Sequence, residues 1–261
     1  TLSCRKNQIY ILPLSIGNCS AMRILRLDEN HLRIMPPTIC KIKTLRELSV
    51  THNQLNELAT GICQLPDLQG LYLDHNKIST IPDAIGDLHT LKAIELDHNS
   101  IRQIPSSFGR LTTLREMSIS YNKIRVIPEE LCLCVCLQKL DVSGNLLTGL
   151  PKDIGKLVQL VDLFAAENQL TEIPETVLRI PTLRGLFMQK NLLTKIPKCV
   201  GDAAECTQLD FGDNQITTTP SEIGNLPLLE IFNIRGNKLT FLPSSIGNLG
   251  KTMKQLGLAY N

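Results

Sequence analysis

The sequence is poor in several features that mark large functional classes. Its 261 residues contain no tryptophan, six phenylalanines and four tyrosines. Lysine and arginine total 27 against 25 aspartate and glutamate residues, so the chain has no charge excess of the kind that nucleic acid or an anionic membrane attracts. No stretch approaches the roughly 18 apolar residues of a membrane span, and no basic and apolar leader begins at Thr1. We therefore expect no nucleic-acid partner and no membrane insertion.

Catalytic motifs are also lacking. The sequence has no H-E-x-x-H, no G-x-S-x-G and no paired C-x-x-C. The segment Gly250-Lys251-Thr252 resembles the end of a phosphate-binding loop, but the glycine that such a loop requires earlier would fall at Ser245. We predict that the chain is not an enzyme and has no catalytic residue, no cofactor and no metal.

What the sequence does have is a repeat of 23 residues. One asparagine per repeat, here called the ladder Asn, recurs at ten successive intervals of 23 residues, and the last follows after 24 residues. The ladder Asn residues are Asn7, Asn30, Asn53, Asn76, Asn99, Asn122, Asn145, Asn168, Asn191, Asn214, Asn237 and Asn261. With 43% hydrophobic residues, the chain can bury a sizeable core. A repeat of this length indicates a solenoid in which each rung buries its apolar face against its neighbours.

Positions in each repeat are counted here from the ladder Asn, which is position 0. Apolar residues recur at positions −8, −5, −3 and +2, as in Leu45, Leu48, Val50 and Leu55 around Asn53. The alternation before the ladder Asn predicts a short strand with one buried and one open face. The ladder Asn itself is expected to be a buried amide that bonds backbone groups, because an unpaired buried amide would be destabilising by about 1–3 kcal/mol.

The other half of each repeat predicts the return path. Proline stands at position +6 in ten of eleven repeats, with Ala59 the exception, so a regular helix is excluded there and an extended start is favoured. Glycine stands at position +10 in seven repeats, where we expect its left-handed freedom to help a turn. The extra residue before Asn261 predicts a bulged loop near Gly250.

These motifs resemble those of leucine-rich-repeat proteins along the whole chain. Segments such as Ile81-Pro-Asp-Ala-Ile-Gly-Asp-Leu88 are similar to the intracellular 23-residue subgroup of Ras-associated scaffolds, plant Ras-group-related repeat proteins, and the Scribble and Erbin arrays. The resemblance implies an α/β horseshoe-shaped solenoid with a concave parallel sheet and a mostly irregular convex side. We expect residues 1–261 to form a single solenoid of about eleven to twelve rungs, and to be a piece of a longer protein that lacks both caps.

The nine cysteines favour a reducing compartment. Cys4 and Cys206 replace apolar residues of the repeat, and Cys40, Cys63 and Cys132 replace the glycine at position +10. Buried thiols that act as small hydrophobic residues are our interpretation, in keeping with a cytoplasmic location. The alternative, a zinc site at Cys132, Cys134 and Cys136, has poor spacing and no fourth ligand.

Positions −6, −4, −2 and −1 should face solvent on the concave sheet, and they are rich in acids between residues 24 and 168. There we count Asp28, Glu29, Glu47, Asp74, Glu95, Asp97, Glu116, Asp141, Asp162 and Glu167 against the bases Arg26 and Lys139. Position −7 is instead basic, with Arg23, Arg46, Lys92, Arg115, Arg184 and Lys254. Mutual pairing of these charges across rungs is one reading. The other is an acidic surface that binds a protein partner with a basic patch.

Half of the ten aromatic residues fall in the same open positions, namely Tyr72, Tyr121, Phe164, Phe187 and Tyr260. Phe164 and Phe187 share position −4 on adjacent rungs, so we expect their side chains to lie about 5 Å apart. Simple stacking is one explanation. The other is a binding site, because aromatic residues often dominate interface energy.

His52, His75 and His98 share position −1 on three successive rungs. A metal site or a pH sensor is conceivable for three neighbouring imidazoles, but ligands stacked in a row do not enclose a tetrahedral ion. We expect a solvated ladder.

The sequence therefore predicts a protein-interaction module or signalling scaffold that binds a partner on its concave face, with a small GTPase or its regulator as a candidate. The alternatives are a substrate- or ligand-recognition arm of a larger enzyme or receptor, and a surface receptor for pathogen molecules. The predicted partner-binding residues are Tyr72, Asp74, Glu95, Asp97, Glu116, Tyr121, Asp141, Asp162, Phe164 and Phe187.

Overall fold

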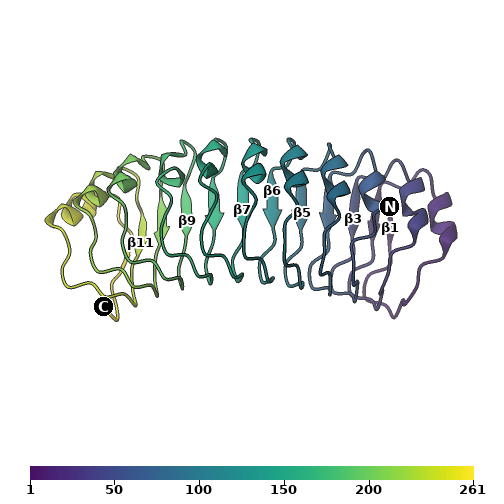
Figure 1. The fold of residues 1–261 in the computed structure, drawn as a ribbon, viewed down its shortest axis with the longest axis horizontal. Coiled ribbons are helices and arrows are strands. Elements are labelled where there is room, and N and C mark those ends of the chain that lie inside the picture. Colours follow the sequence, from purple (N-terminus) through teal and green to yellow (C-terminus); the bar gives the residue numbers. More distant parts are fainter. The chain divides into compact units, whose positions relative to one another are not determined.

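The computed structural model describes residues 1–261, which divide into two compact units at Ile124 and Arg125. Both units repeat one motif, a strand of two or three residues followed by a short 3₁₀ helix (Figure 1). The first unit contains β1 (Leu2–Ser3), η1 (Leu14–Asn18), β2 (Ile24–Arg26), η2 (Pro37–Lys41), β3 (Glu47–Ser49), η3 (Ile62–Gln64), β4 (Gly70–Tyr72), η4 (Asp83–Asp87), β5 (Ala93–Glu95), η5 (Ser106–Arg110) and β6 (Glu116–Ser118).

The second unit continues the same alternation. It contains η6 (Glu129–Leu133), β7 (Lys139–Asp141), η7 (Ile154–Lys156), β8 (Asp162–Phe164), η8 (Val177–Arg179), β9 (Gly185–Phe187), η9 (Lys198–Asp202), β10 (Gln208–Asp210), η10 (Ser221–Asn225), β11 (Ile231–Asn233), η11 (Ser244–Lys251) and β12 (Gln255–Gly257).

Within each unit the strands form a parallel sheet in sequence order. The register advances by one repeat per strand, so that Leu48 pairs with Leu71 in the first unit and Leu163 with Leu186 in the second. Every position of the repeat is therefore stacked on its counterpart in the next rung, about one strand spacing away. The predicted repeat solenoid with a parallel sheet is confirmed.

The core is built from the apolar positions of the repeat. Leu45, Leu48 and Val50 in the first unit are fully buried, as are Leu186 and Leu193 in the second. Because each strand supplies only one buried face, its leucines are shielded by the rungs on either side and by the 3₁₀ segments behind them. The open face of the sheet, formed by positions −6, −4 and −2, carries the remaining side chains.

The ladder Asn is a buried amide, as predicted. Asn53 is 8% exposed; its Nδ2 donates to the carbonyl oxygens of Leu27 and Thr51, and its Oδ1 accepts from the N–H of Leu32 at 2.9 Å. The same pattern recurs in the second unit, where Asn191 bonds the backbone of Ala165, Met188 and Leu170. One side chain thus joins its own turn to the preceding rung.

Proline at position +6 starts the return segment in an extended conformation, with φ and ψ of −69° and 147° at Pro82. The helices that follow are 3₁₀ turns of three to five residues, in agreement with a convex side of short turns. Near Gly250 the prediction of a bulged loop is wrong. Gly250 instead belongs to η11, which is eight residues long where the other 3₁₀ helices have three to five.

Glycine at position +10 does not adopt the left-handed conformation that we expected. The positive-φ glycines are Gly144 and Gly236, at position −1. Gly86 instead lies in η4, where an added Cβ would come within 2.5 Å of the carbonyl oxygen of Ser107. The position is small because consecutive 3₁₀ turns pack closely there.

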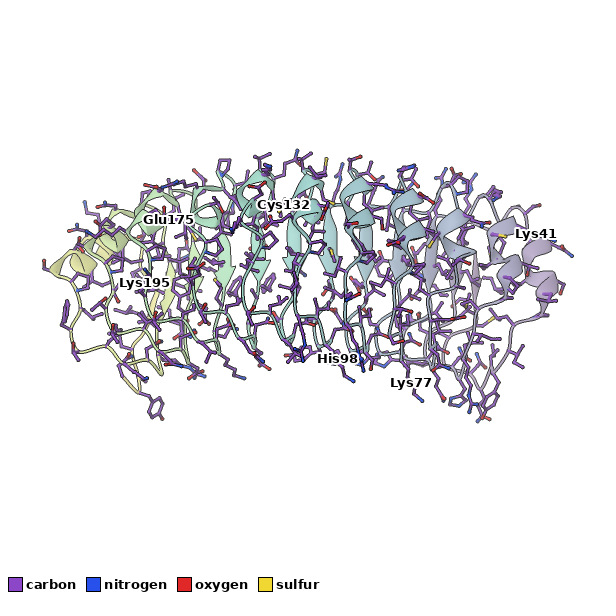
Figure 2. All side chains as sticks on the ribbon, viewed as in Figure 1. Lys41, Lys77, His98, Cys132, Glu175 and Lys195 are labelled. Atoms are coloured by element: carbon purple, nitrogen blue, oxygen red, sulfur yellow. The ribbon has the colours of Figure 1, made fainter.

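All nine cysteines are free thiols. Burial raises the pKa of Cys63 and Cys132 to about 11, and that of Cys134 and Cys206 to about 12. These four thiols stay protonated at neutral pH and act as apolar packing groups. Cys132 lies on the 3₁₀ side of its unit (Figure 2).

Candidate functional site

The end of each strand places side chains of the candidate site through one unusual backbone conformation. Residues at position −1 have positive φ, as in His52, His75 and His98 at 51–52° and Tyr121 at 51°. The left-handed turn frees the chain to leave the sheet and lets the next residue, the ladder Asn, point inward. A sequence signal existed, because two residues at this position, Gly144 and Gly236, are glycines.

Acids at position −2 have a structural task. The backbone N–H of Asp97 donates to Oδ1 of Asp74 at 2.9 Å, and the N–H of Ser120 donates to Oδ1 of Asp97 at 2.5 Å. Asp28, which is 4% exposed, accepts in the same way from Thr51 and pairs with Arg5. These N–H groups have no carbonyl partner in the sheet, so a carboxylate on the preceding rung satisfies them.

In the second unit, acids at position −4 accept backbone N–H groups of the same rung. The N–H of Ser143 donates to Oδ1 of Asp141, and the N–H of Gly212 donates to Oδ1 of Asp210, both at 2.9 Å. The acids of the open face are therefore not purely a charged surface, since several terminate the sheet. The sequence reading treated them as solvated charges and did not anticipate these bonds.

The acidic surface is also less charged than a residue count suggests. Burial, followed by the nearby carboxylates of Glu95 and Asp97, raises the pKa of Asp74 to about 7. Burial likewise raises the pKa of Asp162. At neutral pH, Asp74 therefore contributes less negative charge to this surface than an exposed aspartate would.

Phe164 and Phe187 form the aromatic pair that the sequence predicted. Their ring centroids are 4.6 Å apart and the planes differ by 3°, and both side chains are half-buried on the open face of β8 and β9. The ammonium of Lys139 on β7 lies 5.6 Å from the Phe164 centroid, within cation–π range. The pair offers a flat apolar surface on an otherwise polar sheet.

The Phe187 ring lies back over the start of its own strand. A Cβ added to Gly185 would meet Cε2 of Phe187 at 2.7 Å and Oδ1 of Asp162 at 2.5 Å. The first unit repeats the arrangement, because a Cβ at Gly70 would meet Cε2 of Tyr72 at 2.9 Å. Glycine at position −6 and an aromatic residue at position −4 are a matched pair that sequence reasoning overlooked, although both strands show it as Gly-Leu-Tyr and Gly-Leu-Phe.

A second aromatic column lies in the first unit. His52 stacks on His75 at 4.1 Å, His75 on His98 at 4.2 Å, and His98 on Tyr121 at 4.5 Å, with interplanar angles of 8–11°. We call these four rings the ring column. His98 lies at the margin opposite to the 3₁₀ helices (Figure 2). No group of three or more His, Cys, Asp or Glu side chains is arranged to hold a metal ion, since stacked imidazoles do not converge on a point.

The predicted partner-binding residues thus fall into two sets. Tyr72, Asp74, Glu95, Asp97, Glu116 and Tyr121 belong to the first unit, whereas Asp141, Asp162, Phe164 and Phe187 belong to the second. Tyr260, the remaining aromatic residue at an open position, is 87% exposed. The basic residues at position −7 are exposed at the start of the strands, as expected from the sequence.

Comparison with known families identifies the repeat. The family model described as leucine-rich repeat region matches residues 2–141, and the model of a single leucine-rich repeat matches residues 136–157 and 228–249. The chain belongs to the leucine-rich-repeat family. Families with this fold are in general binding modules for proteins or peptides. No curated protein matches the sequence.

Solved leucine-rich-repeat structures show the same fold. A leucine-rich-repeat protein of Leptospira interrogans is 32% identical with a TM-score of 0.93, and the match covers 97% of this chain and 64% of that protein. The plant peptide hormone receptor RGFR1 in complex with RGF2 is 27% identical, with a TM-score of 0.78 over 99% of this chain and 47% of the receptor. The ectodomain of an Arabidopsis thaliana membrane receptor kinase, in complex with Casparian strip integrity factor 2, is 28% identical, with a TM-score of 0.78 over 100% of this chain and 35% of that ectodomain.

This leucine-rich-repeat chain spans less than two thirds of the length of each of these proteins. None of its helices has the length and apolar character needed to cross a membrane.

Proposed function

We propose that this chain is a protein-interaction module that binds a protein partner through the open face of its sheet. The observation that carries the proposal is the stacked pair Phe164–Phe187. Two half-buried rings lie parallel on the sheet and are surrounded by polar groups, which include Lys139 and Asp162. Aromatic groups in such a setting supply large contact area at low cost in conformational entropy, and a few of them often dominate interface energy.

The first unit supports a partner with a basic patch. Glu95, Asp97 and Glu116 lie on the open face of β5 and β6 or directly after β5. Charge complementarity of this kind accelerates association more than it tightens the final complex. We therefore infer that the partner's basic groups face the first unit.

The repeat type supports a cytoplasmic signalling scaffold, with a small GTPase or its regulator as the partner. The similarity to a plant peptide hormone receptor and to a membrane receptor kinase ectodomain, each solved in a complex, supports the second candidate, a ligand-recognition arm of a larger receptor. The full-length reading frame separates the two, because an attached membrane anchor or catalytic domain supports the second and their absence from the complete protein supports the first.

Replacing both rings tests the proposal. We expect Phe164→Ala/Phe187→Ala to keep the fold, since both rings lie outside the core, and to weaken partner affinity by about tenfold or more. Partners are captured from source-cell extract with the wild-type chain, identified, and then titrated as pure proteins. The wild-type association rate should also fall as salt concentration rises.

Phe241→Ala is the matched control, because this ring is 59% exposed and lies outside the strands. It removes an exposed aromatic ring without touching the open face, so it should retain the partner. An unchanged affinity of the double variant together with a large fall in its melting temperature would show that the two rings stabilise the sheet and do not bind. An association rate that does not change with salt concentration would contradict the inference that the partner carries a basic patch.

A further inference from the structure

The first unit has a hollow of about 400 Å³ on the open face of β2–β5. It exists because position −6 shrinks to Gly70 on β4 and Ala93 on β5, between longer side chains on neighbouring rungs. The Tyr72 ring closes one wall by lying over Gly70. The volume is within the range of sites that bind small molecules.

The rim of this hollow is basic. Arg23, Arg46 and Lys92 line it, and they come from position −7 on three rungs. The backbone holds them in register, since the N–H of Arg46 donates to the carbonyl of Arg23 at 2.8 Å. Parallel pairing therefore places the two arginine side chains about one strand spacing apart.

These cations are available to a ligand. The guanidinium groups of Arg23 and Arg46 make no side-chain hydrogen bond or ion pair within the protein. Lys92 donates to the neutral Oε1 of Gln69 at 3.1 Å. The acid in the lining, Glu47, is already paired with Arg26 at 2.7 Å. Burial, together with nearby Glu95 and Glu47, raises the pKa of Tyr72, so its phenol remains a hydrogen-bond donor.

We propose that this hollow binds a carboxylate side chain of the protein partner, held by Arg23 and Arg46 with Lys92 beside it. This inference rests on the proposed function and names the chemistry of a second anchor. Guanidinium groups pair with carboxylates through two parallel N–H···O bonds, and two adjacent forks suit one carboxylate. A doubly charged phosphate fits less well, because Glu47 lines the same hollow and repels two negative charges more strongly than one.

The partner segment on the first unit is therefore bipolar. Its acidic residue enters the hollow at the start of β3–β5, and its basic residues meet Glu95 at the end of β5, Asp97 after it and Glu116 at the start of β6. An acidic peptide alone or a basic peptide alone satisfies only half of this surface.

The test uses the whole chain and a defined probe. The peptide acetyl-Gly-Glu-Gly-amide is titrated while the Nε–Hε signals of the arginines are followed by NMR, with acetyl-Gly-Gln-Gly-amide and inorganic phosphate as separate arms. We expect saturable shifts of the Arg23 and Arg46 signals with the Glu peptide, weaker effects of phosphate and none with the Gln peptide. Arg46→Gln should lower the affinity for the Glu peptide by about tenfold, which corresponds to the loss of one charge-assisted hydrogen bond.

Two further variants keep the proposal falsifiable. Ala93→Leu fills the floor without removing a cation and should abolish the saturable shift. Arg115→Gln removes a cation from position −7 outside the hollow and should leave the shift intact. Equal shifts with the Gln peptide, shifts with phosphate only, or a response that Ala93→Leu does not change would overturn the proposal. A failure of carboxylate binding in the hollow does not change the result expected for Phe164→Ala/Phe187→Ala. The failure of this proposal can therefore be told apart from the failure of the proposed function.

Discussion

The two units carry their aromatic ladders at different positions of the same repeat. In the first unit the ring column uses position −1, where the backbone is left-handed, and its centroids are 4.1–4.5 Å apart. In the second unit the Phe164–Phe187 pair uses position −4, inside the strand. Position −1 there is held by Gly144, Gly236 and charged residues such as Glu167, which pairs with Lys190 at 2.8 Å.

This difference separates what the repeat requires from what it permits. The buried leucines, the ladder Asn and the extended proline recur in both units, because each supports the rungs beside it. The open positions vary because any side chain placed there stacks on its counterpart one rung away. A ladder of like residues is therefore partly a geometric consequence of the repeat, and its chemistry depends on the column in which it stands.

The largest expected effect should be the same in both units. Asn76→Ala in the first unit and Asn191→Ala in the second each delete a buried amide that bonds three or more backbone groups. The backbone N–H and carbonyl groups left without a hydrogen-bond partner should lower the free energy of unfolding by about 2–4 kcal/mol in each variant. Urea denaturation followed by circular dichroism measures this loss. A difference above about 1 kcal/mol between the two variants would mean that the ladder does not contribute equally to the units.

Most of the fold was predictable from the sequence because it depends on spacing. The interval between ladder Asn residues fixed the strand positions, the register and the aromatic pair at 4.6 Å. Proline fixed the extended start of the return segment for a local reason, its restricted φ.

The features that the sequence did not predict depend on contacts between rungs. Gly86 is required by the carbonyl of Ser107 on the next rung, and no local pattern reveals that contact. Asp74 and Asp97 look like surface charges in the sequence, but each accepts a backbone N–H from the next rung. The hollow beside Arg46 arises from two small residues on consecutive rungs, which are visible only when the repeats are aligned side by side.

A variant of intermediate effect replaces Asp74, which stands at position −2 in the first unit. In the second unit, position −2 carries no acid on the rungs from Ser143 to Gly212. The pKa of Asp74 in the fold is about 7 against an ordinary value of 3.8, so the folded chain binds more protons between these values. Stability contributed by this group is therefore full below pH 4 and is lost as pH rises to 7. Asp74→Asn keeps an oxygen that accepts from Asp97 and should raise the unfolding free energy at pH 8 by about 1–2 kcal/mol, after allowance for solvent.

Urea midpoints at pH 4 and pH 8 check this prediction. The difference between variant and wild type should be small at pH 4 and should grow towards pH 8. Asp97→Asn is the control within the same acidic surface. If Asp74→Asn were destabilising at pH 8, the carboxylate would be ionised and favourably bonded in the fold.

The smallest effect distinguishes the ring column from the phenylalanine pair. Burial, followed by the like charges of His52 and His98, lowers the pKa of His75, with Asp97 acting in the opposite direction. The folded chain therefore disfavours a proton on His75, so the stability linked to it is present above about pH 6.5 and is lost as pH falls towards the lowered pKa. Because His75 is exposed, the loss should stay below about 1 kcal/mol.

The opposite slope from Asp74 would mask this loss, so the comparison belongs in the Asp74→Asn background. There, His75→Asn keeps a residue that tolerates positive φ and removes the titrating ring. Its urea midpoint should depend less on pH between 5 and 7.5 than that of the parent, whereas Phe164→Ala/Phe187→Ala should leave the dependence unchanged. An equal flattening by both variants would show that proton binding is not specific to the ring column, and the chemical distinction between the two ladders would then fail.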